Sequence, residues 1–101
     1  MHKKLLELLI GFDWDEGNLH KSRRKHGVST QEAEEVFVNS PLIITDDFKY
    51  SETENRYHAL GISNEGKKLS VCFTIRNRAI RIISARVMSK KELEIYVKTQ
   101  N

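Results

Sequence analysis

Arginine side chains within an apolar stretch are the strongest sign of chemistry in this sequence. Four of them lie in residues 69–86, namely Arg76, Arg78, Arg81 and Arg86. Arg81 lies between Ile80 and Ile82, so in a strand its guanidinium would project from the opposite face to the two isoleucines. A guanidinium in that position needs a carboxylate partner or an anion. Its two parallel donors also match the non-bridging oxygens of a phosphodiester, where charge builds up during cleavage.

A structural role is an equal alternative for Arg81 and Arg86. The stem of an arginine can pack on a sheet while its charged head reaches water. Arg86 and Lys90–Lys91 also lie around the start of a predicted helix, whose N-terminus can itself hold an anion. The sequence leaves both interpretations open.

A second group of candidate residues is Glu54, Arg56 and His58. They alternate along one predicted strand, so their side chains would share a face. A carboxylate, a guanidinium and an imidazole side by side could support general acid–base chemistry at a phosphodiester. Spacing alone favours the simpler interpretation, an exposed strand face with a weak Glu–Arg ion pair.

Several common kinds of site have no motif in this sequence. The histidines stand in no His-x-x-x-His frame, Cys72 is the only cysteine, and there is no Gly-rich phosphate loop or Gly-x-Ser-x-Gly elbow. We therefore expect no metal and no cofactor. Cys72 falls in a predicted strand, and we expect a small buried side chain there rather than a nucleophile.

Charge is unevenly distributed along the chain. The net charge is +3, but residues 67–101 carry nine Lys or Arg against two Glu, whereas residues 1–66 carry eight against twelve acidic residues. A basic C-terminal half favours a polyanionic partner, although a solvated basic surface explains it equally well. Another basic cluster consists of Lys21, Arg23, Arg24, Lys25 and His26, and it could bind a nucleic-acid backbone or complement a helix C-terminus.

Length and composition predict a single globular domain, 1–101. No apolar run approaches the ~20 residues that span a bilayer. The apolar run Leu5–Ile10 is too short for a signal peptide, so the cytosol is the expected location.

The predicted order of elements is three helices, then four strands, then a last helix. Capping boxes at Ser29–Glu32 and Ser89–Glu92 each predict the start of a helix. Further helices are expected over 3–10 and about 14–26, with a brief extended or turn segment at residues 12–15. Strands are expected over 42–45, 54–62, 69–75 and 79–86, with only Arg76–Arg78 between the last two. Asn77 tolerates the left-handed backbone of a tight hairpin turn between the last two.

Consecutive strands joined by short turns predict an α+β fold. The strands would form a small antiparallel β-meander, with the N-terminal helices and the C-terminal helix packed on one face.

Several short motifs, in this order, resemble the BrnT toxin family. They are Phe12–Asp15, Lys25–Val28, Glu54-x-Arg56-x-x-x-Leu60-Gly61, Arg81–Arg86 and Glu92 with Tyr96. The resemblance runs from about Gly11 to Tyr96, and residues 1–10 look like an N-terminal helical extension. It implies a RelE-like ribonuclease fold, RNA cleavage without a metal, growth arrest, and inhibition by a co-expressed, DNA-binding BrnA-type antitoxin.

Together these features predict a metal-independent endoribonuclease toxin. A 2′-hydroxyl would attack the adjacent phosphate, with Glu54 or a nearby histidine such as His58 as base and Arg56, Arg81 and Arg86 stabilising charge. RNA would be held by Lys21, Arg23, Arg24, Lys25, His26, Arg76 and Arg78. The toxin–antitoxin complex could contain a toxin dimer.

Two alternatives come from other classes of protein. One is a nucleic-acid-binding module without catalysis, and the other is a subunit whose arginines meet an acidic protein partner. Readers of single-stranded RNA usually stack bases on aromatic side chains of a sheet. Tyr57 and Phe73 are the main candidates for such stacking, and both could equally belong to the core.

Overall fold

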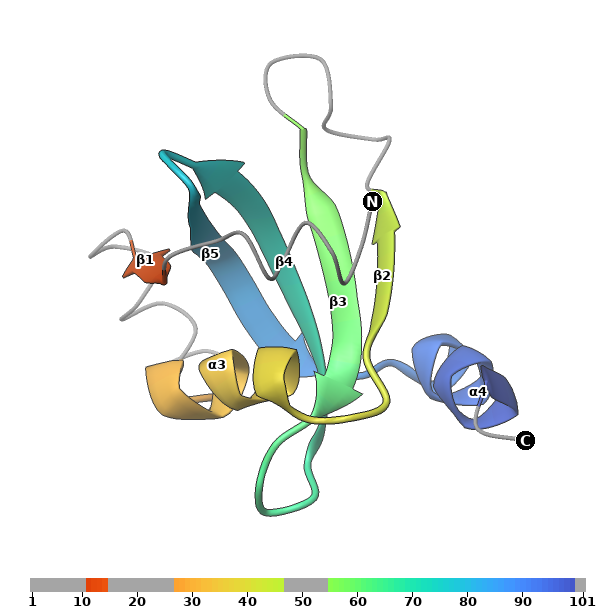
Figure 1. Ribbon diagram of the computed structural model, residues 1–101. Coiled ribbons are helices and arrows are strands. Elements are labelled where there is room, and N and C mark those ends of the chain that lie inside the picture. The colour runs from red at the N-terminus through yellow and green to blue at the C-terminus, as the bar shows by residue number, and fades with distance from the viewer. Residues whose placement is uncertain (1–10, 15–26, 47–54, 100–101) are drawn as a thin grey trace.

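The computed structural model describes residues 11–14, 27–46 and 55–99, which form five strands and two helices (Figure 1). In chain order they are β1 (Phe12–Trp14), α3 (Thr30–Val38), β2 (Ile43–Asp46), β3 (Tyr57–Ile62), β4 (Lys68–Arg76), β5 (Ala79–Val87) and α4 (Lys90–Thr99). The helix expected over 3–10, and that expected over 14–26 apart from Trp14, lie outside the described residues. Neither described helix is long and apolar enough to cross a membrane.

The strands form one sheet in the order β1-β5-β4-β3-β2. The antiparallel meander of β2 to β5 confirms the prediction. The sheet also has a fifth strand: β1 lies in the segment expected to be extended or in a turn, but its parallel pairing with β5 was not predicted. Three residues are too few to show a strand period, and their partner strand lies far along the sequence.

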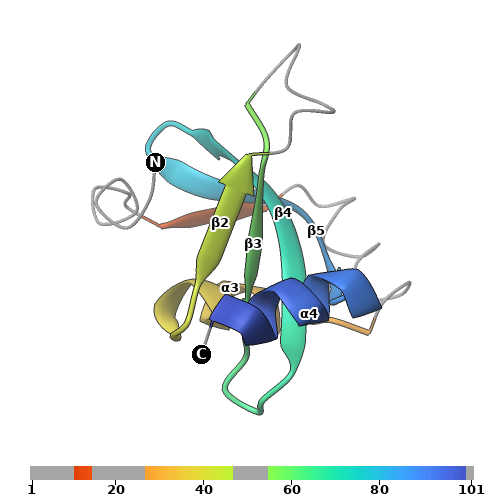
Figure 2. The same cartoon turned by 90° about the vertical axis from the view of Figure 1, so that its right-hand side faces the viewer.

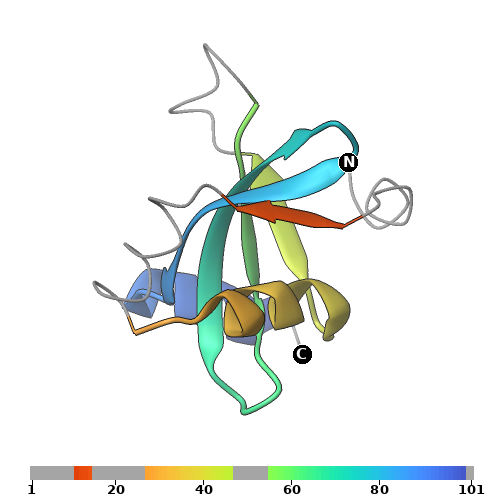
Figure 3. The same ribbon diagram turned by 90° about the vertical axis from the view of Figure 1, so that its left-hand side faces the viewer.

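The two described helices lie on opposite faces of the sheet, as Figures 2 and 3 show, so the expectation of helices on one face is wrong. The reason is visible in β4, where six consecutive residues, Leu69–Thr74, are buried. Leu69, Val71 and Phe73 belong to the core cluster that includes α3 residues. Ser70 faces the other way and donates a hydrogen bond to Glu92 of α4.

The hydrophobic core fills the space between α3 and the sheet. Ala33 and Val36 of α3 are fully buried against residues of β3, β4 and β5. The predicted capping box begins this helix, since Glu32 N–H donates to Ser29 Oγ (3.2 Å) and Ser29 N–H donates to Glu32 Oε1 (3.0 Å). Each bond satisfies a backbone donor that a helix start would otherwise leave unpaired.

The hairpin between β4 and β5 has a two-residue turn. Arg76 pairs with Ala79, and Asn77 and Arg78 between them have φ values of 50° and 64°. Positive φ at both positions is the geometry that matches the twist of paired strands. The expected left-handed conformation of Asn77 is therefore confirmed, and the turn carries exposed Arg76 and Arg78 at one end of the sheet.

Gly61 lies at a close contact between β3 and α3. A Cβ added at Gly61 would lie 2.5 Å from Val36 Cγ1 and 3.3 Å from the Val36 carbonyl oxygen. Real Cβ atoms do not approach other heavy atoms so closely, so the helix can lie on the strand only because this residue lacks a side chain.

We expect Gly61→Ala to lower the free energy of unfolding by roughly 1–3 kcal/mol, because the added methyl overpacks this contact. Urea denaturation of the purified variant measures the loss. The matched control is the same substitution in a Val36→Ala background, where the nearest methyl is gone and the additional cost should be smaller. An equal cost in both backgrounds would contradict this account.

Candidate functional site

One face of the sheet carries polar side chains, and we call it the polar face. Ser70 is paired with Arg86, Cys72 with His58 and Ser84, and Thr74 with Arg81. Residues directly opposite one another on neighbouring strands share a face. The polar face therefore includes His58 on β3, Ser70, Cys72 and Thr74 on β4, and Arg81, Ser84 and Arg86 on β5.

A β-bulge brings Arg81 and Arg86 to the same face. Residues five apart in a regular strand point in opposite directions, because the side-chain period is two. In β5 the register shifts between the pairs Cys72–Ser84 and Phe73–Ile82, which leaves Ile83 as one extra residue. Such a residue resets the alternation. As a result Ile82 stays in the core and both guanidinium groups lie on the polar face.

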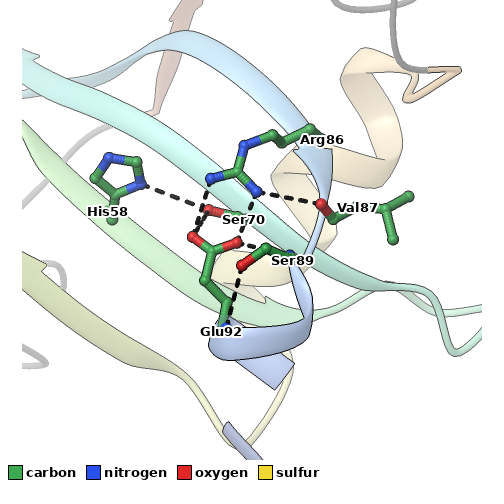
Figure 4. A network of polar contacts seen from close by, with 6 residues as sticks. All are labelled: His58, Ser70, Arg86, Val87, Ser89 and Glu92. Atoms are coloured by element: carbon green, nitrogen blue, oxygen red, sulfur yellow. Dashed lines mark hydrogen bonds and ion pairs between the residues drawn. The ribbon is translucent and has the colours of Figure 1, made fainter. Parts of the chain in front are cut away.

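Arg86 is held by Glu92 from the first turn of α4 (Figure 4). Its Nη1 donates to Glu92 Oε1 at 2.6 Å and its Nη2 donates to Glu92 Oε2 at 3.0 Å. This is the paired geometry in which an arginine binds a carboxylate most strongly. The Arg86 side chain is still 38% exposed, against 20% for Glu92, so solvent reaches the cation.

The Glu92 carboxylate accepts two further hydrogen bonds. Ser89 N–H donates at 2.8 Å, and Ser70 Oγ donates at 3.1 Å from the adjacent strand. Glu92 N–H in turn donates to Ser89 Oγ, which confirms the predicted capping box. Burial alone would raise the pKa of Glu92, but the hydrogen bonds from Arg86, Ser89 and Ser70 outweigh it and lower the pKa to about 2. The same pairing raises the pKa of Arg86.

The far end of α4 is fixed by a buried tyrosine. Tyr96 is fully buried, and its hydroxyl donates to the carbonyl oxygen of Pro41 at 2.7 Å. Burial raises the pKa of this hydroxyl, which keeps it a donor. Tyr96 and Glu92 thus attach successive turns of one helix face to the rest of the fold.

Arg81 has the carboxylate partner that its position required. Its Nη1 donates to Asp13 Oδ2 of β1 at 3.0 Å, and the Asp13 side chain is 49% exposed. The prediction that Arg81 points away from Ile80 and Ile82 is confirmed, because both isoleucines are buried in the core on the other face. The ion pair is open to water, where such pairs are weak and an incoming anion can compete.

His58 contacts Ser70 on the neighbouring strand. The distance from His58 Nδ1 to Ser70 Oγ is 3.5 Å, which links the imidazole through Ser70 to Glu92 and Arg86 (Figure 4). Arg56 lies two residues earlier, just before β3, which begins at Tyr57 rather than at residue 54. Glu54 lies outside the described residues.

The structure thus brings together three of the five predicted catalytic residues, namely His58, Arg81 and Arg86, on one face. Of the predicted RNA-binding residues, Arg76 and Arg78 are exposed on the hairpin turn. The others, Lys21, Arg23, Arg24, Lys25 and His26, lie outside the described residues. Cys72 is buried, as predicted.

Sequence reasoning missed Ser70 and the second role of Glu92. Glu92 was recognised as a helix cap and as part of a family motif, but not as the partner of Arg86, which its two oxygens hold. The sequence did contain a signal for this ion pair. Arg86 lies near the end of a predicted strand and Glu92 lies in the first turn of the helix that follows, and a basic and an acidic residue so placed are suited to pair. In the described part of the chain, no three His, Cys, Asp or Glu side chains gather in a way that could hold a metal ion.

These features suit a small α+β nuclease. Guanidinium groups bind phosphate oxygens and stabilise added charge, and an imidazole can transfer protons. Comparison with known proteins agrees. The chain belongs to the family described as "Ribonuclease toxin, BrnT, of type II toxin-antitoxin system", whose sequence profile matches residues 14–92. Family membership makes it a ribonuclease toxin with an RNA substrate and an antitoxin partner.

The fold is also similar to a solved structure, the ribonuclease toxin BrnT of Brucella abortus. The TM-score is 0.59 at 21% sequence identity, over 80% of this chain and 99% of that chain. No curated protein sequence matches the chain. The resemblance inferred from the motifs is therefore confirmed at the level of the family and the fold.

The low pKa of Glu92 predicts how stability depends on pH. The folded carboxyl has a pKa of about 2 against 4.5 as its ordinary value, so protonation favours the unfolded chain. The stabilisation is fully present above pH 4.5 and is lost as the pH falls toward 2. An upper limit is about 3 kcal/mol, and because solvent reaches Arg86 we expect roughly 1–2 kcal/mol.

We therefore expect Glu92→Gln to be less stable than the unsubstituted chain at pH 7 and nearly as stable near pH 2. Chemical denaturation across this range measures the difference. Glu94→Gln, at an exposed position of the same helix, is the control and should show no such convergence. A constant difference at all pH values would mean that the carboxylate charge contributes nothing.

Proposed function

We propose that this ribonuclease toxin cuts RNA on the polar face, by attack of a 2′-hydroxyl on the adjacent phosphate. The observation that carries the proposal is the bulge at Ile83, which gives Arg81 and Arg86 a common face with His58. Two guanidinium groups and an imidazole supply charge stabilisation and proton transfer in one place. Such cations can stabilise negative charge at the phosphate as a metal ion would, so we propose that the reaction needs no metal ion.

The two arginines have different roles in this proposal. Arg81 is paired with the half-exposed carboxylate of Asp13, and a phosphate can displace that carboxylate. Arg81 would then stabilise the charge on the non-bridging oxygens. Arg86 is fixed by Glu92 at two oxygens, and it would orient the phosphate through its exposed edge. His58 or Glu54 would accept the proton of the 2′-hydroxyl, and Arg56 would assist.

RNA outside the reacting phosphate would be held by basic residues near the site. Arg76 is the last residue of β4, and Arg78 lies in the turn that leads to β5; both are exposed. The same two strands carry most of the polar face. Arginine side chains on such a turn can follow a phosphate backbone. We propose that the cluster at 21–26 adds to this surface and that residues 1–101 form one catalytic domain.

A binding module without catalysis is less well supported. Its stacking candidates, Tyr57 and Phe73, pack on each other with ring centroids 5.4 Å apart, and Phe73 is fully buried beside Phe37. They belong to the core side of the sheet. The polar face offers arginine and histidine instead, which suits chemistry at a phosphate better than stacking of bases.

The antitoxin partner would be of the BrnA type, a DNA-binding protein that covers the polar face. Acidic side chains could neutralise Arg81 and Arg86, and exclusion of RNA would then need no change in the toxin. We further propose that the complex can contain a toxin dimer, and that it acts in the cytoplasm.

Cleavage tests the proposed site directly. We expect purified protein to cut RNA in excess EDTA and to leave 2′,3′-cyclic phosphate ends. Arg81→Ala should slow cleavage roughly hundredfold or more, since it removes charge stabilisation in the transition state. Arg81→Lys should also be poor, because an ammonium lacks the paired donors. Activity that disappears on chelation and returns with magnesium would refute the metal-free mechanism.

The control for Arg81 is Asp13→Asn. It removes the same ion pair but keeps the guanidinium, so it should retain most of the cleavage activity. Similar losses in the two variants, both folded by circular dichroism, would mean that Arg81 serves only to hold β1.

Amide hydrogen exchange locates the antitoxin surface. With a BrnA-type antitoxin bound, we expect slower exchange in β3 and β5, because the partner excludes water from the polar face. The core side of α3, at residues 33–37, should change little and serves as the internal reference. Protection confined to α3, with both strands unaffected, would refute inhibition by covering the site.

A further inference from the structure

We propose that Ser70 and Glu92 are positioning residues that fix the tautomer of His58, with the ring proton on Nδ1. The neutral ring would then present Nε2 as its basic nitrogen. The inference deepens the proposed function, since it rests on His58 being the residue that accepts a proton from RNA. It concerns two residues that contact neither the phosphate nor the 2′-hydroxyl in that scheme.

The first step is the charge of Glu92. Three donors that cannot act as acceptors point at this carboxylate, namely Nη1 and Nη2 of Arg86 and the backbone N–H of Ser89. A carboxyl group that receives three such bonds is ionised, and an ionised carboxylate can only accept hydrogen bonds. The bond between Ser70 and Glu92 at 3.1 Å must therefore use the hydroxyl hydrogen of Ser70.

The second step is the direction of the contact between Ser70 and His58. A serine hydroxyl has one hydrogen and two lone pairs. Because its hydrogen is directed to Glu92, Ser70 Oγ can only accept at its other contact, 3.5 Å from His58 Nδ1. His58 Nδ1 must then carry a proton. In a neutral imidazole the other nitrogen, Nε2, is the acceptor.

These successive hydrogen bonds orient the groups that form them and pass no proton along the series. The order Arg86, Glu92, Ser70, His58 runs from β5 through α4 and β4 to β3 (Figure 4). Ser70 is only 2% exposed, so water does not compete freely for its hydroxyl. A histidine in water favours the proton on Nε2, so the protein reverses that preference. The choice of tautomer decides which nitrogen can act as a base.

Nitrogen-15 NMR tests the tautomer without any need for activity. We would record long-range ¹H–¹⁵N correlations of the full chain at a pH where the ring is neutral, and assign His58 by its absence in His58→Gln. The expected spectrum has a protonated Nδ1 and an unprotonated Nε2. In Ser70→Ala the ring should move toward the Nε2-protonated form. Ser70→Thr keeps a hydroxyl and should retain the original pattern.

The matched control is Ser84→Ala, an exposed serine on the same face, which should leave the His58 signals unchanged. An Nε2-protonated ring in the unsubstituted chain would overturn the inference. So would an unchanged tautomer in a folded Ser70→Ala. If Ser70→Ala fails to fold, Glu92→Gln removes the ionised acceptor and should produce the same loss of the Nδ1-protonated form.

Cleavage by Ser70→Ala separates this inference from the proposed function. If His58 is the base, kcat should fall by at least about tenfold while KM changes little, because Nε2 would then carry the proton and could not accept one from the substrate. A tautomer that shifts as expected with no change in kcat would uphold the positioning of His58 and refute its role as the base.

Discussion

The candidate site depends on one departure from regular strand geometry. A strand sends alternate side chains to opposite faces, so Arg81 and Arg86 belong on the same side only if the strand contains an extra residue between them. Ile83 is that residue. The bulge lets β5 contribute Ile80, Ile82 and Ala85 to the core while presenting both arginines on the other face. In a regular strand one of these two arginines would lie on the core face, because residues five apart point in opposite directions.

Glu92 connects several elements around the polar face. The same carboxylate caps α4, holds Arg86 at two oxygens and accepts from Ser70, so the start of the helix and two strands share one charged group. Ser70 makes this possible, because its buried hydroxyl reaches the Glu92 carboxylate at 3.1 Å. The C-terminal helix, for which the sequence predicted only packing against the sheet, is thus part of the polar network.

Local signals predicted much of the fold and less of the site. Capping boxes, the Asn77 turn and the meander depend on residues close in sequence, and each was found as expected. The pairing of β1 with β5 depends on contacts 68 positions apart, such as that between Asp13 and Arg81, which leave no periodic pattern. The bulge has no local signal either, because a run of isoleucines fits a regular strand equally well. Roles for Glu54 and for residues 21–26 remain predictions.

The parallel pairing of β1 with β5 has a consequence for protein synthesis. Asp13 of β1 pairs with Arg81 and Glu92 of α4 holds Arg86, and β1 can join the sheet only once β5 is present. A nascent or truncated chain that ends before α4 lacks the partner of Arg86 and the cover over Ser70. The proposed site would therefore be incomplete during synthesis until α4 has been made and Glu92 can fix Arg86.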